Sequence, residues 1–82
     1  MSYPNYPYEV EIHDKEGYFD RIASYRTELQ AINSMPAHIA KAQADAADHP
    51  EDYAGCFFKL VKHEVDGCQE WHEPIQDFPI TF

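Results

Sequence analysis

Apolar and polar residues alternate strictly along residues 8–13, YEVEIH. This period of two is typical of a strand with one buried face, so we expect Glu9 and Glu11 to point outward, away from the core. Residues 14–17, DKEG, predict a hairpin loop that ends in glycine. The aromatic-rich residues 18–26, YFDRIASYR, then predict a returning strand with apolar side chains on both faces.

A helical pattern follows over residues 28–48, where alanine is abundant. Thr27 opens the capping-box sequence TELQ, which predicts the helix start. Pro36, with a serine two residues before it, predicts a kink or a short break. The pair His49-Pro50 predicts the helix end, because a residue before proline avoids the helical region. The predicted buried stripe consists of Leu29, Ile32, Met35 and Ile39.

The last third of the chain predicts a second hairpin. Residues 53–65 have strand composition, Asp66-Gly67 is a strong two-residue turn signal, and residues 68–75 predict the partner strand. The 82 residues therefore predict a single small α+β domain. Its expected architecture is an antiparallel sheet of about four strands in the order ββαββ, with one kinked helix packed on one face. Residues 1–7 and 76–82 are expected to be terminal arms.

The second hairpin also carries two cysteines and two histidines, Cys56, His63, Cys68 and His72. Structural zinc sites bring their ligands in close pairs, and this spacing matches none of them. With the turn predicted above, His63 would face Glu70, and Cys68 and His72 would lie roughly 13 Å apart on one strand. One ion cannot bridge that distance, so we expect no metal site and no cofactor.

No catalytic motif is present in the sequence. Each histidine–carboxylate pair that the sequence shows consists of two adjacent residues. Adjacent residues of a strand point to opposite faces, so adjacency alone makes none of these pairs a catalytic one. Neither cysteine lies at a predicted helix start or among cations, the settings that activate a thiol. The sequence therefore predicts a protein that is not an enzyme.

The charge balance excludes some partners and favours others. Fifteen acidic residues against six basic ones give a net charge of −9. This charge opposes direct binding to nucleic acid or to an anionic membrane, and it favours a protein partner with a basic surface. No apolar run is long enough to span a bilayer, and MSYPNYPY lacks the features of a signal peptide, so we expect a cytoplasmic protein with reduced cysteines.

Two surfaces are candidates for binding. Acidic side chains would steer association with a basic partner, and large aromatic side chains would anchor the contact. The candidate residues are Glu9, Glu11, Asp14, Glu16, Asp20, Asp45, Asp48, Glu51 and Asp52, with Tyr18, Tyr25 and Trp71 as anchors. The second surface is the sheet face that one helix cannot cover, where the arms, a second copy of the chain or a partner could pack.

The stretches YEVEIHDKEGYFDRIASY and FKLVKHEVDGCQEW, with the capped helix from TELQ between them, support a resemblance. A short, acidic ββαββ chain without a catalytic motif resembles the small anti-defence proteins of phages, the anti-CRISPR proteins among them. The resemblance implies a stoichiometric inhibitor that occupies a basic surface of a nucleic-acid-guided complex, in the host cytoplasm if the chain is phage-encoded. These proteins share no common motif, so the resemblance assigns no binding residue.

Two other functions fit the same sequence. The first is a homo-oligomeric structural or assembly protein, such as a homodimer, that uses an exposed apolar sheet face. The second is a small metal-binding protein built on the Cys/His hairpin. Salt separates electrostatic docking from apolar assembly, because only the former weakens steeply as ionic strength rises.

Overall fold

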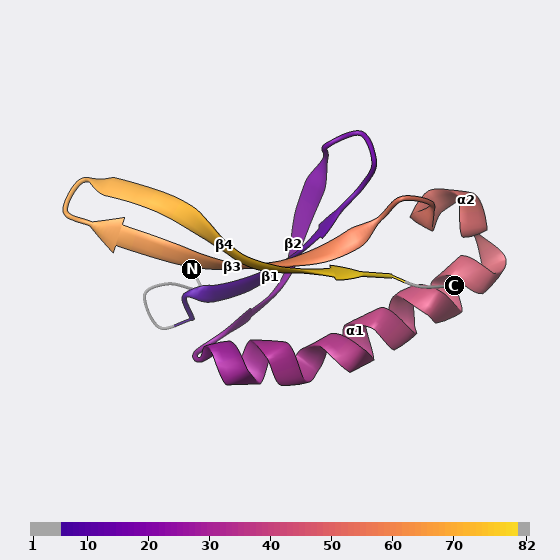
Figure 1. The fold of residues 1–82 in the computed structure, drawn as a ribbon, viewed down its shortest axis with the longest axis horizontal. Helices are drawn as coiled ribbons and strands as arrows, with labels where there is room; N and C mark the ends of the chain where they lie inside the picture. The colour runs from indigo at the N-terminus through magenta and orange to yellow at the C-terminus, as the bar shows by residue number, and fades with distance from the viewer. Residues whose placement is uncertain (1–5, 81–82) are drawn as a thin grey trace.

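The structure, a computed structural model, describes residues 6–80 and confirms the α+β architecture. Its four strands form one antiparallel sheet in the order β2-β1-β3-β4, with the long helix α1 across one face (Figure 1). A one-turn helix, which the sequence pattern did not predict, follows α1. The elements are β1 Tyr8–His13, β2 Phe19–Tyr25, α1 Glu28–Asp48, α2 Pro50–Tyr53, β3 Phe57–Asp66 and β4 Gln69–Pro79.

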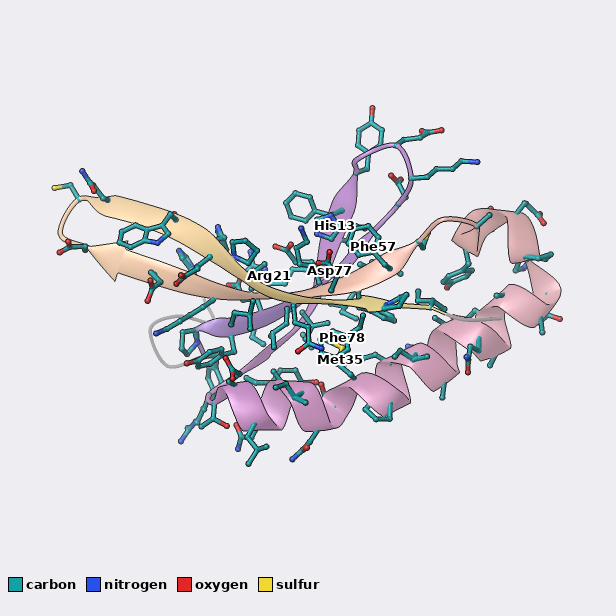
Figure 2. The ribbon with its side chains drawn as sticks, in the orientation of Figure 1. His13, Arg21, Met35, Phe57, Asp77 and Phe78 are labelled. Carbon is teal, nitrogen blue, oxygen red and sulfur yellow. The ribbon has the colours of Figure 1, made fainter. Side chains whose placement is uncertain are left out.

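The core lies between α1 and the sheet. Figure 2 shows Met35 and Phe78 in this layer, whereas His13, Arg21, Phe57 and Asp77 project from the opposite face of the sheet. The buried positions of α1 are Ala31, Met35, Ala42 and Ala46. The first three form a cluster with Val10, Phe58, Leu60 and Ile80. Small alanine side chains along the contact let the helix approach the strands closely.

The predicted helix stripe is wrong at one position. Leu29 is 67% exposed, whereas Met35 is buried and Ile32 and Ile39 are partly buried against the core. Successive helix residues are rotated by about 100°, so Leu29 lies roughly 120° around the axis from Met35. The two isoleucines lie within about 60° of Met35 and flank the contact. None of the helices within residues 6–80 is both long and apolar enough to cross a membrane.

Pro36 does not interrupt the helix. α1 continues from Glu28 to Asp48 with the proline inside it, so the predicted break is absent, and Figure 1 shows one curved helix. Ser34 does not cap a second segment, because its hydroxyl donates a hydrogen bond of 2.6 Å to the carbonyl of Ala31. The predicted cap at Thr27 is confirmed: its side chain accepts a hydrogen bond from the backbone N–H of Gln30 at 3.1 Å.

The second hairpin differs from the prediction in its turn. Asp66 pairs with Gln69, so the two loop residues are Gly67 and Cys68 rather than Asp66 and Gly67. Gly67 has φ +62°, and no non-glycine residue in the described chain has a positive φ. A primed turn with glycine in the first central position needs only one positive φ, whereas the Asp-Gly turn needs two. The shift by one residue brings His63 opposite His72.

Strand β4 also extends further than expected. It continues through Pro74 to Pro79, so residues 76–79 are strand rather than arm, and Ile80 belongs to the core. Because β4 is an edge strand, its prolines can lack an N–H without breaking the inner ladder. Residues 81–82 of the predicted C-terminal arm and residues 1–5 of the N-terminal arm lie outside the described residues. Pro7, in the described part, accepts a 2.7 Å backbone hydrogen bond from His63.

Candidate functional site

The sheet face opposite α1 carries a group of charged and imidazole side chains. Val10 and Leu60 face the helix, so the residues that alternate with them in β1 and β3, including Glu9 and His63, point to the opposite face. A bulge in β2 opposite the step from Val10 to Glu11 pairs Glu11 with Arg21 rather than with Ile22. Without this extra residue Arg21 would not share the face of Glu9.

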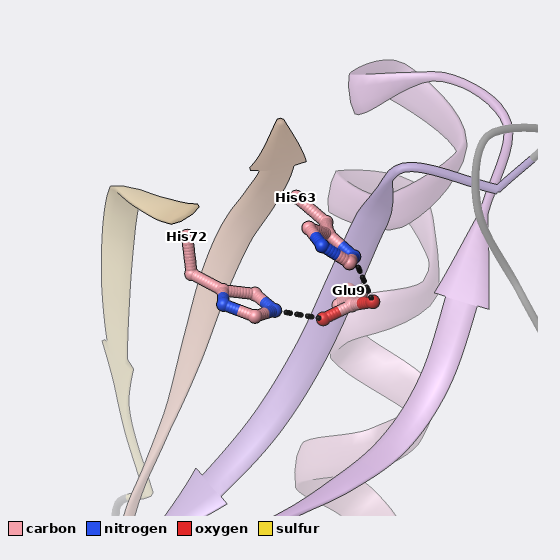
Figure 3. Close-up of side chains that lie close together, drawn as sticks. All are labelled: Glu9, His63 and His72. Atoms are coloured by element: carbon pink, nitrogen blue, oxygen red, sulfur yellow. Dashed lines mark ion pairs between the residues drawn. The ribbon is translucent and has the colours of Figure 1, made fainter. Parts of the chain in front are cut away.

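Glu9 is the centre of this group. Its side chain is 1% exposed, and the Arg21 Nη1 atom donates a 3.1 Å hydrogen bond to its Oε2 atom. Two imidazoles from the second hairpin approach the same carboxylate (Figure 3): His72 Nε2 lies 3.2 Å from Oε1, and His63 Nδ1 lies 3.6 Å from Oε2. The two imidazole rings stack with centroids 4.4 Å apart. One carboxylate thus interacts with residues of three strands.

A second histidine–carboxylate pair lies further along β1. His13 Nε2 is 2.8 Å from Glu11 Oε1. The imidazole is stacked between Phe19, with ring centroids 4.9 Å apart, and Phe57, with centroids 5.2 Å apart. A groove of about 460 Å³ on this face is lined by residues of both groups, among them Glu9, Glu11, Arg21 and His72. The face opposite α1 therefore carries a groove that combines charged side chains with apolar ones such as Phe19 and Val61.

Two of the predicted binding residues are not on the surface. Glu9 and Glu11 point away from the helix as expected, but both are buried. The expectation of an exposed acidic row on this strand is wrong, because β1 lies inside the sheet between β2 and β3. Side chains of the flanking strands, including Arg21 and Val61, stand beside these carboxylates in the groove.

The first hairpin, from its loop to the start of β2, holds four predicted residues. Asp14 shapes the loop, since its Oδ1 accepts backbone hydrogen bonds from Glu16 at 2.8 Å and Tyr18 at 3.0 Å. Glu16 and Asp20 are exposed, and Tyr18 is 73% exposed. The tip of this hairpin therefore presents carboxylates and an aromatic ring to solvent.

The acidic residues at the C-terminal end of α1 and in α2 lie around a second groove, of about 520 Å³. Asp45, Asp48 and Asp52 line it together with Tyr53 and Cys56. Asp45 accepts a 3.2 Å hydrogen bond from the Tyr53 hydroxyl. Burial raises the pKa of the Cys56 thiol, and the nearby carboxylates of Asp14 and Asp52 raise it further. Glu51 is exposed in α2 and is the sequence neighbour of Asp52, which lines this groove.

The two loops with acidic residues lie side by side. A Cβ atom placed on Gly55 would be 2.9 Å from Lys15 Cβ. The carboxylates of Asp14 and Asp52 also both lie close enough to the Cys56 thiol to raise its pKa. We call this region the acidic end. Its charged residues are Asp14, Lys15, Glu16, Asp45, Asp48, Glu51 and Asp52, which are six carboxylates and one ammonium group.

The remaining predicted anchors are separated from the acidic end. Trp71 is 43% exposed in β4 near the tip of the second hairpin, which Figure 1 shows on the opposite side of the molecule from α2. Tyr25 is half-buried, and its hydroxyl lies 2.9 Å from His38 Nε2 of α1. Tyr25 therefore joins β2 to the helix and is not an exposed anchor. His38 also packs near Phe58, with ring centroids 6.0 Å apart.

Sequence patterns missed the group of Glu9, His63 and His72. The glycine turn was the available signal, because a turn at Gly67 and Cys68 places the two histidines opposite each other. Both cysteines are free thiols, and neither joins a cluster of three or more ligand-type side chains within the described chain. Comparisons with protein-family models, with curated proteins and with solved structures give no match to this chain. Its function is therefore inferred from the geometry above.

Proposed function

We propose that the protein is a non-enzymatic binding module of the cytoplasm that inhibits a partner by occupying its basic surface. The observation that carries this proposal is the groove of the acidic end, where Asp45, Asp48 and Asp52 line one hollow of about 520 Å³. Three carboxylates around one hollow favour the entry of a lysine or arginine side chain. A basic groove that normally holds a nucleic-acid backbone is the chemistry that such a surface complements.

The acidic end combines charge with apolar area. Tyr18 and Phe19, which is 56% exposed, follow the loop that carries Asp14 and Glu16. Aromatic side chains next to charged groups supply buried area at the centre of a contact, while the carboxylates raise the association rate. The proposed partner is a nucleic-acid-binding complex of the defence type, because its basic surface would fit a protein with a net charge of −9.

The test is a capture experiment with matched variants. The protein is immobilised, lysate of its source organism or host is applied, and captured proteins are eluted along a salt gradient. We compare the wild type with Asp48→Asn/Asp52→Asn at the acidic end and with Asp66→Asn/Glu73→Gln on the second hairpin. Both variants lose two negative charges, and removal of charge at the end of α1 relieves an unfavourable interaction with the helix dipole.

We expect the wild type to capture a nucleic-acid-binding protein, which is released at moderate salt and displaced by added DNA or RNA. Its capture should fall at least about tenfold with the acidic-end variant, since two close charge pairs contribute on the order of 1.4 kcal/mol or more. The hairpin variant should retain it. Equal loss with both variants, or recovery of the protein itself alone, would refute the proposal, and self-capture would indicate a homo-oligomer instead.

A further inference from the structure

We propose that Glu9, His63 and His72 bind one divalent transition-metal ion of the zinc class in the groove on the open face of the sheet. One ligand-type atom from each residue lies within 4.8 Å of the other two (Figure 3). The proposal is independent of the acidic end, which shares none of these residues.

The donor set determines the class of ion. Two imidazoles and one carboxylate suit Zn²⁺, Co²⁺, Ni²⁺ or Cu²⁺, whereas Mg²⁺ and Ca²⁺ prefer sites built from oxygen ligands. Bonds of about 2.0–2.2 Å place neighbouring ligands of a tetrahedral ion roughly 3.3 Å apart. The distance of 3.2 Å between His72 Nε2 and Glu9 Oε1 already fits this value. His72 is 43% exposed, so its ring can turn to shorten the distance between its Nε2 atom and the His63 imidazole.

Arg21 does not block this geometry. Its guanidinium bonds to Oε2 of Glu9, whereas His72 faces Oε1. The carboxylate can therefore bind an ion through Oε1 and keep Arg21 on Oε2, as a group outside the ligand shell that orients the ligand. The nearby positive charge lowers the affinity for every divalent cation, so only ions that bind imidazole strongly, such as Zn²⁺, should keep a measurable affinity.

The sheet fixes the backbone positions of the three ligands and leaves a path for the ion. The three residues come from β1, β3 and β4, which are adjacent strands of one sheet. Glu9 and His63 are buried, while His72 lies at the edge strand and lines the groove. Three protein ligands leave at least one coordination position for water or another ligand. Because an ion would join three strands, binding should also stabilise the fold.

The test is an isothermal titration calorimetry experiment in which metal-stripped protein is titrated with ZnCl2. A titration with MgCl2 is the negative control. We expect each chain to bind one zinc ion, and we expect the Tm of the protein to rise as zinc is added. His72→Gln should weaken zinc binding at least about tenfold, the scale of change seen even when groups outside the ligand shell are lost. Since His72 is partly exposed, this variant should fold; Glu9→Gln and His63→Gln should give the same loss if they fold.

The matched control is His13→Gln, which removes a histidine from the same face and from an equally close carboxylate. It should bind zinc as the wild type does. Visible absorption of the Co²⁺ complex should indicate nitrogen and oxygen ligands, and ¹⁵N spectra should show shifts of the His63 and His72 imidazoles. Absence of 1:1 zinc binding, retention of it in His72→Gln, or equal loss in His13→Gln would each overturn the proposal.

Discussion

Replacement of Leu60 by alanine tests where the core of this protein lies. Leu60 is fully buried in β3, pairs with Val10 of β1, and belongs to the same cluster as Met35 of α1. The substitution removes three carbon atoms from the layer between sheet and helix. At about 0.8 kcal/mol for each buried methylene-sized group, the lost transfer free energy is roughly 2.4 kcal/mol.

The cavity adds to this cost. Leucine-to-alanine changes in cores cost about 2–5 kcal/mol in all, because the surroundings relax only in part. We expect about 3–4 kcal/mol for Leu60→Ala, since rigid paired strands limit collapse around the site. A chain of this length has a free energy of unfolding of roughly 4–12 kcal/mol, so the variant should lose about a quarter or more of its stability.

Leu29→Ala is the matched control, because Leu29 is the helix leucine that lies on the solvent side. It should change the free energy of unfolding by less than about 0.5 kcal/mol, as surface substitutions do. The measurement is urea unfolding followed by circular dichroism, with the slope m compared among the three proteins. If Leu29→Ala proved as destabilising as Leu60→Ala, the described packing of α1 on the sheet would be wrong.

Three further predictions concern a helix cap, two glycines in turns and one half-buried histidine. Thr27→Ala should cost about 1 kcal/mol of stability in urea unfolding through loss of the helix cap, and Thr27→Ser should retain most of it. Gly67→Ala should cost roughly 1–2 kcal/mol for its positive φ alone; Gly55→Ala should cost more, because its φ is +80° and the new Cβ would lie 2.9 Å from Lys15 Cβ. Burial, and then the charge of Lys41, lower the pKa of His38 below its usual 6.5; protons therefore bind the unfolded state first, and stability should fall as pH drops from about 7 to 5. His38→Gln should show a shallower loss over that pH range, and an unchanged pH profile would contradict this role.

The sequence alone determined the elements whose signals are local. The alternation in residues 8–13 identifies β1, and the cap at Thr27 and the proline after His49 delimit α1. The order of strands and helix, and hence the α+β class, follows from these signals because each depends on neighbours within a few residues. The acidic residues after α1 were likewise visible, although their proximity to the first hairpin loop was not.

The tertiary structure decided which outward side chains are exposed and which meet. Glu9 alternates outward by its own sequence, yet it is buried because β1 lies between two other strands. Its contact with Arg21 depends on a bulge, and its contacts with His63 and His72 depend on which residues form the second turn. Moving the turn by one residue moves each cross-strand partner by two residues, from Glu70 to His72 opposite His63, so local patterns that tolerate either turn cannot assemble this group. The packing of the whole sheet determines which residues form the turn.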